Sequence, residues 1–206
     1  MNKTDKNRTK LFDKKFNELF ENKMTNNRRV LPVRMDLRFP KEYDHDGLNK
    51  EISKFHKTLQ QSYRDQGIDV GYHTVREQRT SPNPHYHSML FFNGDKVRNP
   101  YGVKKRCGEI WNSIVGYEGE GLVHHCTHKP EHPIPALEMV HRPARKATGE
   151  ERKRQKEKFE KSCEIVRKHA EYLNKSYSKG TAPKRVREVF TSQVRISFRE
   201  PQNYPE

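Results

Sequence analysis

Apolar and polar residues alternate along the chain with two different periods, one helical and one strand-like. Apolar residues on one side of residues 11–21 predict an amphipathic N-terminal helix. Residues 30–39 alternate apolar and charged side chains from Val33 onward, which is typical of a half-buried strand. Apolar residues at three- and four-residue intervals predict a second helix over residues 48–63.

The rest of the chain continues this succession of short strands and helices. Two strand-like runs, 69–77 and 85–92, are separated by a loop rich in Pro and Asn, which predicts a hairpin. The later elements are a helix, a short strand, a long helix and a last strand, expected over residues 101–115, 121–126, 148 to about 175 or 178, and 186–198.

Without the first helix, the predicted order is βαββαβ followed by the long helix. This order predicts an α+β fold of the ferredoxin-like or RRM-like kind, in which an antiparallel sheet carries two helices on one face. We expect the long C-terminal helix to lie on the other face. An open sheet face on a basic protein is a natural place for a nucleic acid or an active site.

Composition narrows the class of protein. The 206 residues include 42 Lys+Arg and 27 Asp+Glu, a net charge of +15, and this surplus indicates a polyanionic partner. Residues 142–187 hold 16 basic and 6 acidic residues, which concentrates the charge around the long helix. No run approaches the roughly 20 apolar residues of a spanning helix, and the basic start followed by an amphipathic segment does not predict a secretory signal. Three cysteines without a C-x-x-C pair indicate a reducing cytoplasm.

The sharpest chemical feature is His85-Tyr86-His87 on a predicted strand. Side chains two apart on a strand share a face, so the two imidazoles project together. The hairpin can bring Glu77 beside them, and two imidazoles with one carboxylate suit a divalent ion with open positions. A polar strand face that holds two histidines by chance is the simpler alternative. His73 shares the face of Glu77 and is a weaker ligand candidate.

The second feature is Tyr172-Leu-Asn-Lys175 near the end of the long helix. Residues three apart lie on the same helical face, so the ammonium of Lys175 can favour the phenolate of Tyr172 and neutralise a reacting phosphate. The alternative is a core tyrosine beside an ordinary surface lysine.

Together these motifs resemble the HUH endonuclease superfamily of tyrosine-dependent nicking enzymes, and more narrowly the rolling-circle replication proteins of filamentous phages (inoviruses) and prophages. The resemblance covers about residues 30–195. The segments that carry it are 33–39, 76–77 with 84–90, 121–123, 170–175 and 190–193. It implies a domain division into an N-terminal amphipathic helix and basic leader (1–29), an endonuclease domain (30–195) and a C-terminal tail (196–206).

The resemblance implies that His85, His87 and Glu77 hold Mn²⁺ or Mg²⁺ and that Tyr172, supported by Lys175, is the nucleophile. Tyr172 would attack single-stranded origin DNA, leave a 5′-phosphotyrosine and a free 3′-OH, and so initiate rolling-circle replication in the cytoplasm of a bacterial host. A helicase and a polymerase would come from the host or the element, because the chain has no phosphate-binding G-x-x-x-x-G-K-[ST] loop. The basic residues expected to hold DNA are Arg34, Arg76, Arg167, Lys168 and Lys179.

One departure from the family concerns the number of tyrosines. Some relatives use two tyrosines on one helical face, whereas Tyr177 lies five residues after Tyr172, roughly 140° around a helix. A mechanism with one tyrosine is therefore expected, with Tyr177 as the lesser candidate.

Three alternatives remain open. The run His124-His125-Cys126-Thr127-His128, with His132 and His141 behind it, could bind Zn²⁺, although Cys126 has no close cysteine partner. A non-catalytic RRM-like module would stack bases on aromatic side chains of an open sheet face, for which Tyr72, Tyr86 and Phe92 are the candidates. A transposase or relaxase would share the site chemistry but act on a mobile element.

Overall fold

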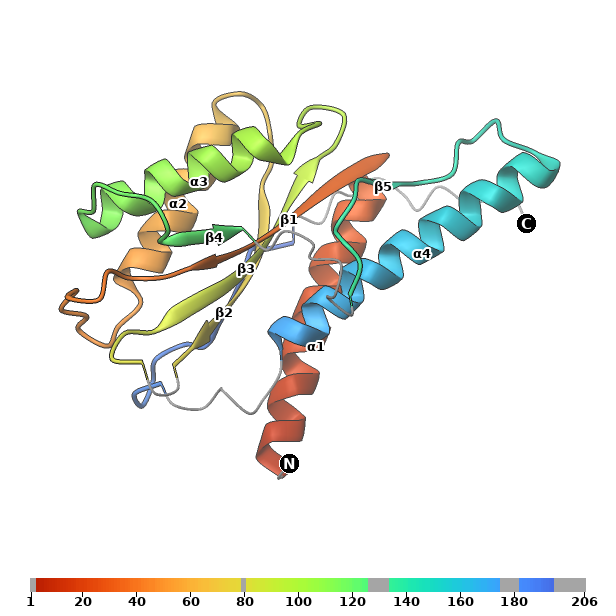
Figure 1. Cartoon of the computed structure of the whole chain (residues 1–206). Helices are drawn as coiled ribbons and strands as arrows, with labels where there is room; N and C mark the ends of the chain where they lie inside the picture. Colours follow the sequence, from red (N-terminus) through yellow and green to blue (C-terminus); the bar gives the residue numbers. More distant parts are fainter. Residues whose placement is uncertain (1–2, 79–80, 126–133, 175–181, 195–206) are drawn as a thin grey trace.

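The computed structural model describes residues 3–78, 81–125, 134–174 and 182–194, and it confirms the α+β class (Figure 1). The long helix begins at Gly149, where the sequence pattern places it, whereas the N-terminal helix is about twice as long as its apolar stripe. In chain order the elements are α1 (Lys3–Asn26), β1 (Arg29–Leu37), α2 (Lys50–Arg64), β2 (Gly71–Glu77), β3 (His85–Asn93), α3 (Pro100–Val115), β4 (Val123–His125), β5 (Val140–His141), α4 (Gly149–Leu173) and β6 (Val189–Thr191).

All strand pairs in the six-stranded sheet are antiparallel. The order is β4-β1-β3-β2-β6, with β5 paired to the start of β1, and this arrangement is compatible with a ferredoxin-like fold. The register sets Asp36 opposite His87 and Glu77 opposite His85. Three strands therefore bring polar side chains together near one end of the sheet.

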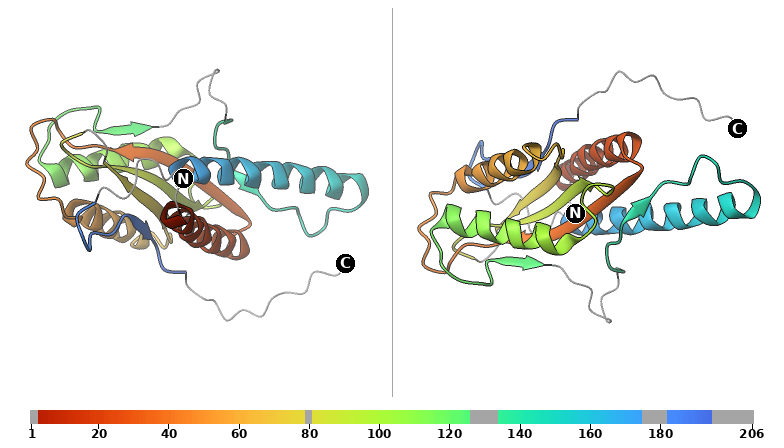
Figure 2. Two further views of the ribbon diagram at one scale, coloured as in Figure 1. Left: turned by 90° about the horizontal axis from the view of Figure 1, so that it is seen from below. Right: turned by 90° about the horizontal axis from the view of Figure 1, so that it is seen from above.

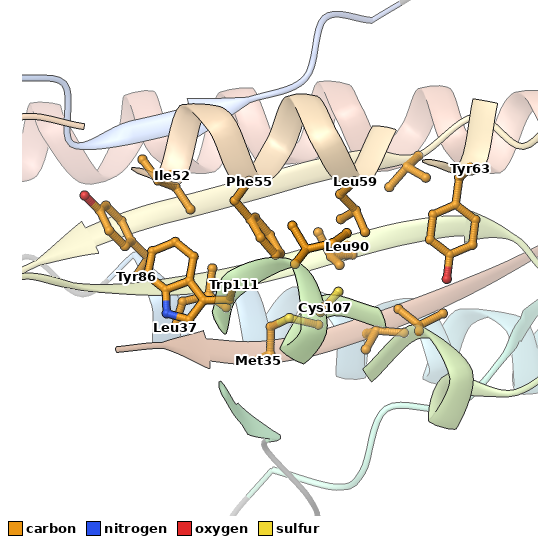
Figure 3. Close-up of a cluster of buried hydrophobic side chains, with 14 of the residues drawn as sticks. Met35, Leu37, Ile52, Phe55, Leu59, Tyr63, Tyr86, Leu90, Cys107 and Trp111 are labelled. Carbon is orange, nitrogen blue, oxygen red and sulfur yellow. The ribbon is translucent and has the colours of Figure 1, made fainter. Parts of the chain in front are cut away.

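Helices α2 and α3 cover one face of the sheet and enclose the larger core (Figures 1 and 3). Phe55 of α2 and Trp111 of α3 meet edge to face at 5.8 Å between ring centroids, above Tyr86 of β3. The indole Nε1 of Trp111 donates to the carbonyl of Arg38 at 2.6 Å, so the ring is buried without an unpaired donor.

Helices α1 and α4 pack against the opposite face (Figures 1 and 2). Phe16, Leu19 and Phe20 of α1 join Met89 and Phe91 of β3 in a second buried cluster. The long C-terminal helix thus lies on the face expected for it. Helix α1 packs on the same face as α4, so the segment expected to be a leader forms part of the folded body. The assigned tail, residues 196–206, lies outside the described residues.

Two buried histidines are held neutral by the core. Burial lowers the pKa of His56 to about 3, and burial also lowers the pKa of His73 to about 4. His56 stacks on Tyr72 at 3.8 Å and shares a hydrogen bond of 2.9 Å with the hydroxyl of Thr74. Both imidazoles therefore have to stay unprotonated for the native packing to persist.

We expect the free energy of unfolding to fall as the pH is lowered from about 6.5 to about 4. The unfolded chain protonates its histidines near pH 6.5 and so binds more protons than the native state across this window, which favours unfolding. The expected loss is on the order of 3 kcal/mol for each buried histidine. Urea unfolding of the metal-free protein at several pH values measures it. A His56→Gln variant should show a shallower pH dependence than wild type, and His141→Gln, at an exposed position, should change the slope less. Equal slopes in His56→Gln and wild type would contradict the prediction.

Candidate metal centre and tyrosine site

The β2–β3 hairpin places three potential metal ligands together. One ligand atom each from Glu77, His85 and His87 lies within 4.8 Å of the others, on the face of the sheet that α1 and α4 partly cover. The exposed fractions of the Glu77, His85 and His87 side chains are 18%, 26% and 13%, so the group is accessible from solvent. This cluster is a candidate metal-binding triad.

His87 lies between two carboxylates. Its Nδ1 is 2.6 Å from Oδ1 of Asp36, and its Nε2 is 3.0 Å from Oε2 of Glu77. When Nδ1–H donates to Asp36, the Nε2 lone pair is directed at the position between His87 and Glu77. Metal-binding histidines are commonly oriented in this way by a carboxylate on the other ring nitrogen. The contact fits a divalent ion that lies between Nε2 of His87 and the carboxylate of Glu77.

Asp36 is held in its ionised form by its surroundings. Burial alone would raise the pKa of this carboxyl. The hydrogen bond with His87 and the positive charges of His87, Arg34 and His124 outweigh burial and lower the pKa below its usual range. Sequence analysis missed this residue. The sequence did contain a signal for it: Asp36 is a carboxylate within the alternating strand 33–39, on the face opposite the apolar residues Val33 and Met35.

Tyr172 lies in the last turn of α4 and keeps 36% of its surface exposed. The guanidinium carbon of Arg34 lies 4.5 Å from the centroid of its ring, a cation–π contact. Nη1 of Arg34 is 3.2 Å from Nδ1 of His169, whose Nε2 donates to the carbonyl of Pro135 at 2.9 Å. The phenol is thus held beside a fixed positive charge.

The metal triad and Tyr172 are linked through one strand. Arg34 and Asp36 are two residues apart on β1, so they share a face of the sheet. The end of α4 is fixed by Asn174, whose Oδ1 is 3.1 Å from Nε2 of His73 and whose Nδ2 donates to Asp13 at 2.7 Å. Two long-range contacts therefore hold the tyrosine-bearing turn against this face.

The basic residues expected to hold DNA have different environments. Arg76 is only 2% exposed, and it donates to the carbonyls of Gly47 and Leu48 on the opposite face of the sheet. The expectation that Arg76 contacts DNA is therefore corrected. Its guanidinium provides hydrogen-bond donors to backbone carbonyls of the loop before α2. Arg34 is 7% exposed and contacts Tyr172 instead of presenting a free surface charge.

The remaining charged candidates lie on or after α4. Arg167 and Lys168 are exposed; the first lies 5.9 Å from the ring of Phe20, and the second pairs with Glu164 at 2.7 Å. Lys175, Lys179 and Tyr177 lie outside the described residues.

The structure bears on the RRM-like alternative and on part of the histidine-rich run proposed to bind zinc. Tyr86 and Phe92 are fully buried beneath α2 and α3, so they offer no surface on which bases could stack in an RRM-like manner. In the histidine-rich run, His124 and His125 lie on β4, and His124 Nδ1 is 3.9 Å from Asp36. Cys126, His128 and His132 lie outside the described residues.

Fold and site together define an α+β protein with a ferredoxin-like arrangement and a candidate His–His–Glu metal centre. The chain belongs to the YagK/YfjJ C-terminal domain family, whose model matches residues 1–186 and so spans both α1 and the tyrosine helix. No curated protein and no solved structure gives a significant match. Within the described residues, no helix has the length and apolar character needed to cross a membrane.

Proposed function

We propose that this protein is a metal-dependent nickase and strand transferase that acts on single-stranded DNA through a 5′-phosphotyrosine intermediate and initiates rolling-circle replication. The observation that carries the proposal is the link along β1: Asp36 orients His87 of the triad, and Arg34, two residues away, holds Tyr172. A tyrosine-dependent nuclease requires a metal site and a positioned phenol, and here both lie on the same face of the sheet.

The proposed reaction is a transesterification. The oxygen of Tyr172 forms a bond to the scissile phosphorus, its proton passes to solvent, and the bond from phosphorus to the 3′ oxygen breaks. That oxygen takes up a proton and becomes a 3′-OH from which a polymerase can extend. The guanidinium of Arg34 lies against the face of the Tyr172 ring and holds the phenol in place. Rejoining is the same reaction in reverse, with a 3′-OH as the nucleophile.

Glu77, His85 and His87 would hold the divalent ion, with Asp36 fixing the ring of His87. When bound, the ion supplies Lewis-acid polarisation of the phosphoryl oxygen. A mixed nitrogen and oxygen donor set suits Mn²⁺, and Mg²⁺ at higher concentration. The proposed partners are single-stranded origin DNA and a helicase and polymerase from the host or the element.

The test uses the full chain, Mn²⁺ and linear single-stranded oligonucleotides that together cover the parent replicon, each labelled at its 5′ or its 3′ end. A 5′-phosphotyrosine retains the downstream fragment, so we expect a denaturation-resistant protein band that carries the 3′ label. The 5′-labelled fragment should be released with an extendable 3′-OH. Chelation by EDTA should abolish both products. The proposal fails if no strand of the replicon gives an adduct, or if the adduct carries the 5′ label.

Asp36→Asn is expected to weaken Mn²⁺ binding by about 10–100-fold, because loss of an orienting partner typically costs that much in metal affinity. Isothermal titration with Mn²⁺ measures the effect directly. The matched control is Asp95→Asn, an exposed carboxylate that pairs with Arg29. Unchanged affinity in Asp36→Asn would remove the carboxylate from the proposed centre.

A further inference from the structure

Helix α4 extends well beyond the sheet. Its 25 residues span about 37 Å, and its buried residues, from Cys163 onward, all lie in its C-terminal half. Residues 149–158 project away from the body of the protein (Figures 1 and 2). The connection from β5 contacts this projecting part, where the backbone N–H of Ala144 donates to Oε1 of Gln155 at 2.8 Å.

Half of the basic residues of α4 lie in one line along the helix. The helix holds eight basic and six acidic residues, so its net charge is only +2. Four cations nevertheless recur at intervals of four, three and seven residues, which places them in one line along the helix. The next position in that line, four residues further, is Tyr172. We call these cations the basic row: Arg154, Lys158, Lys161 and Lys168, all exposed.

Four of the six acidic residues of α4 follow a neighbouring line. Glu157, Glu160, Glu164 and Glu171 recur at intervals of three, four and seven residues, about a quarter turn from the basic row. Two members of the row pair with glutamates: Arg154 with Glu151 at 2.5 Å, and Lys168 with Glu164 at 2.7 Å. These pairs offset part of the charge, but because the other acidic residues lie about a quarter turn away, the row still gathers positive charge along one edge of an almost neutral helix.

Cations near the paired ends of β1 and β5 extend this positive surface. His141 on β5 has a pKa that is lowered by burial and by the positive charges of Arg29, Lys158 and Arg28. These cations therefore lie close enough to act on one side chain. Like charges three or four residues apart destabilise a helix by a few tenths of a kcal/mol. A polyanion bound along the row would offset that cost.

We propose that the basic row binds the sugar–phosphate backbone of the DNA strand and leads it along α4 to Tyr172. This inference rests on the proposed nicking function and names the surface that holds its substrate. Arg154 and Tyr172 are 18 positions apart, about 27 Å of helix, so the row can follow the strand over several nucleotides. Because the row meets phosphates, this part of the binding is independent of base sequence.

The decisive variant is the triple substitution Arg154→Gln, Lys158→Gln, Lys161→Gln. The matched control, Arg152→Gln, Lys153→Gln, Lys156→Gln, removes the same charge from exposed positions of the same segment but off the row. Fluorescence anisotropy with a 30-nucleotide single strand between 50 and 200 mM salt gives the affinity and its salt slope. Three lost phosphate contacts should lower the slope by about 2 and the affinity by at least about tenfold in the row variant. The control should stay within about twofold of wild type, and circular dichroism checks that both helices form.

Equal losses in the two variants would show an effect of net charge alone and overturn the proposal, as would wild-type affinity in the row variant. Adduct formation on saturating DNA is scored separately and should persist in the row variant. If wild type forms no adduct but the row variant alone loses binding, the nicking function fails while the row stands. If wild type forms the adduct and both variants bind normally, the row fails while the nicking function stands.

Discussion

In a Tyr172→Phe variant we expect the covalent protein–DNA adduct to disappear and strand cleavage to fall below about one thousandth of the wild-type rate. Removal of a nucleophile eliminates the intermediate itself, so the loss is among the largest that one substitution causes. The phenylalanine ring can keep the contact with Arg34, because that contact involves the ring face, which lies 4.5 Å from the guanidinium carbon. Binding of single-stranded DNA should therefore stay within about twofold of wild type.

The adduct assay with 3′-labelled DNA and the anisotropy titration together measure this prediction. Tyr101→Phe is the matched control, because Tyr101 is also exposed but lies at the start of α3. Its adduct yield should equal that of wild type. A persistent adduct in Tyr172→Phe would assign the nucleophile to another residue, and Tyr177 would then be the first to substitute.

The second large effect is expected for His85→Ala. The substitution removes one of the three proposed ligands, so Mn²⁺ affinity should fall by more than the roughly 10–100-fold expected for a residue that only orients a ligand. Cleavage should become undetectable at Mn²⁺ concentrations that saturate wild type. His85 is a better choice than His87, because removal of His87 would leave the largely buried Asp36 without its partner. The longer 3.8 Å contact of His85 with Glu77 costs little to lose.

Titration with Mn²⁺ and the cleavage assay are compared with His141→Ala, which replaces an exposed histidine on β5. The control should bind the ion and cleave as wild type does. Salt-sensitive DNA binding should persist in His85→Ala, because phosphate contacts by basic side chains are separate from the triad. Normal metal binding in His85→Ala would show that the ion binds elsewhere, and the histidines of β4 would be the next residues to substitute.

The pH dependence of folding and that of catalysis should be measured separately. His56 and His73 lower stability below pH 6.5 whether or not an ion is bound. Loss of activity between pH 6.5 and 4 therefore needs a parallel unfolding measurement before it is assigned to the metal centre.

Sequence periodicity predicted the element order, except for the two-residue strand β5, because it depends on neighbours in the chain. The alternation over β1 and β3 and the helical spacing over α2 and α3 are local patterns, and the α+β class follows from their order. Local geometry also set His85 and His87 on one face, with Glu77 across a short hairpin. The same alternation places Arg76 and Glu77 on opposite faces, a consequence that the choice of Arg76 as a DNA contact overlooked.

Contacts between distant segments were decided only by the tertiary structure. Asp36 meets His87 across 51 residues of chain, and Arg34 meets Tyr172 across 138. Both pairings depend on the register of β1 with β3 and on the packing of α4 over the sheet, and no local period encodes either one. The sequence thus determined the face on which the histidines lie, and its motifs singled out the side chains of the proposed chemistry. The tertiary structure decided which carboxylate orients the triad and which cation holds the phenol, because those partners are brought together by strand pairing and helix packing.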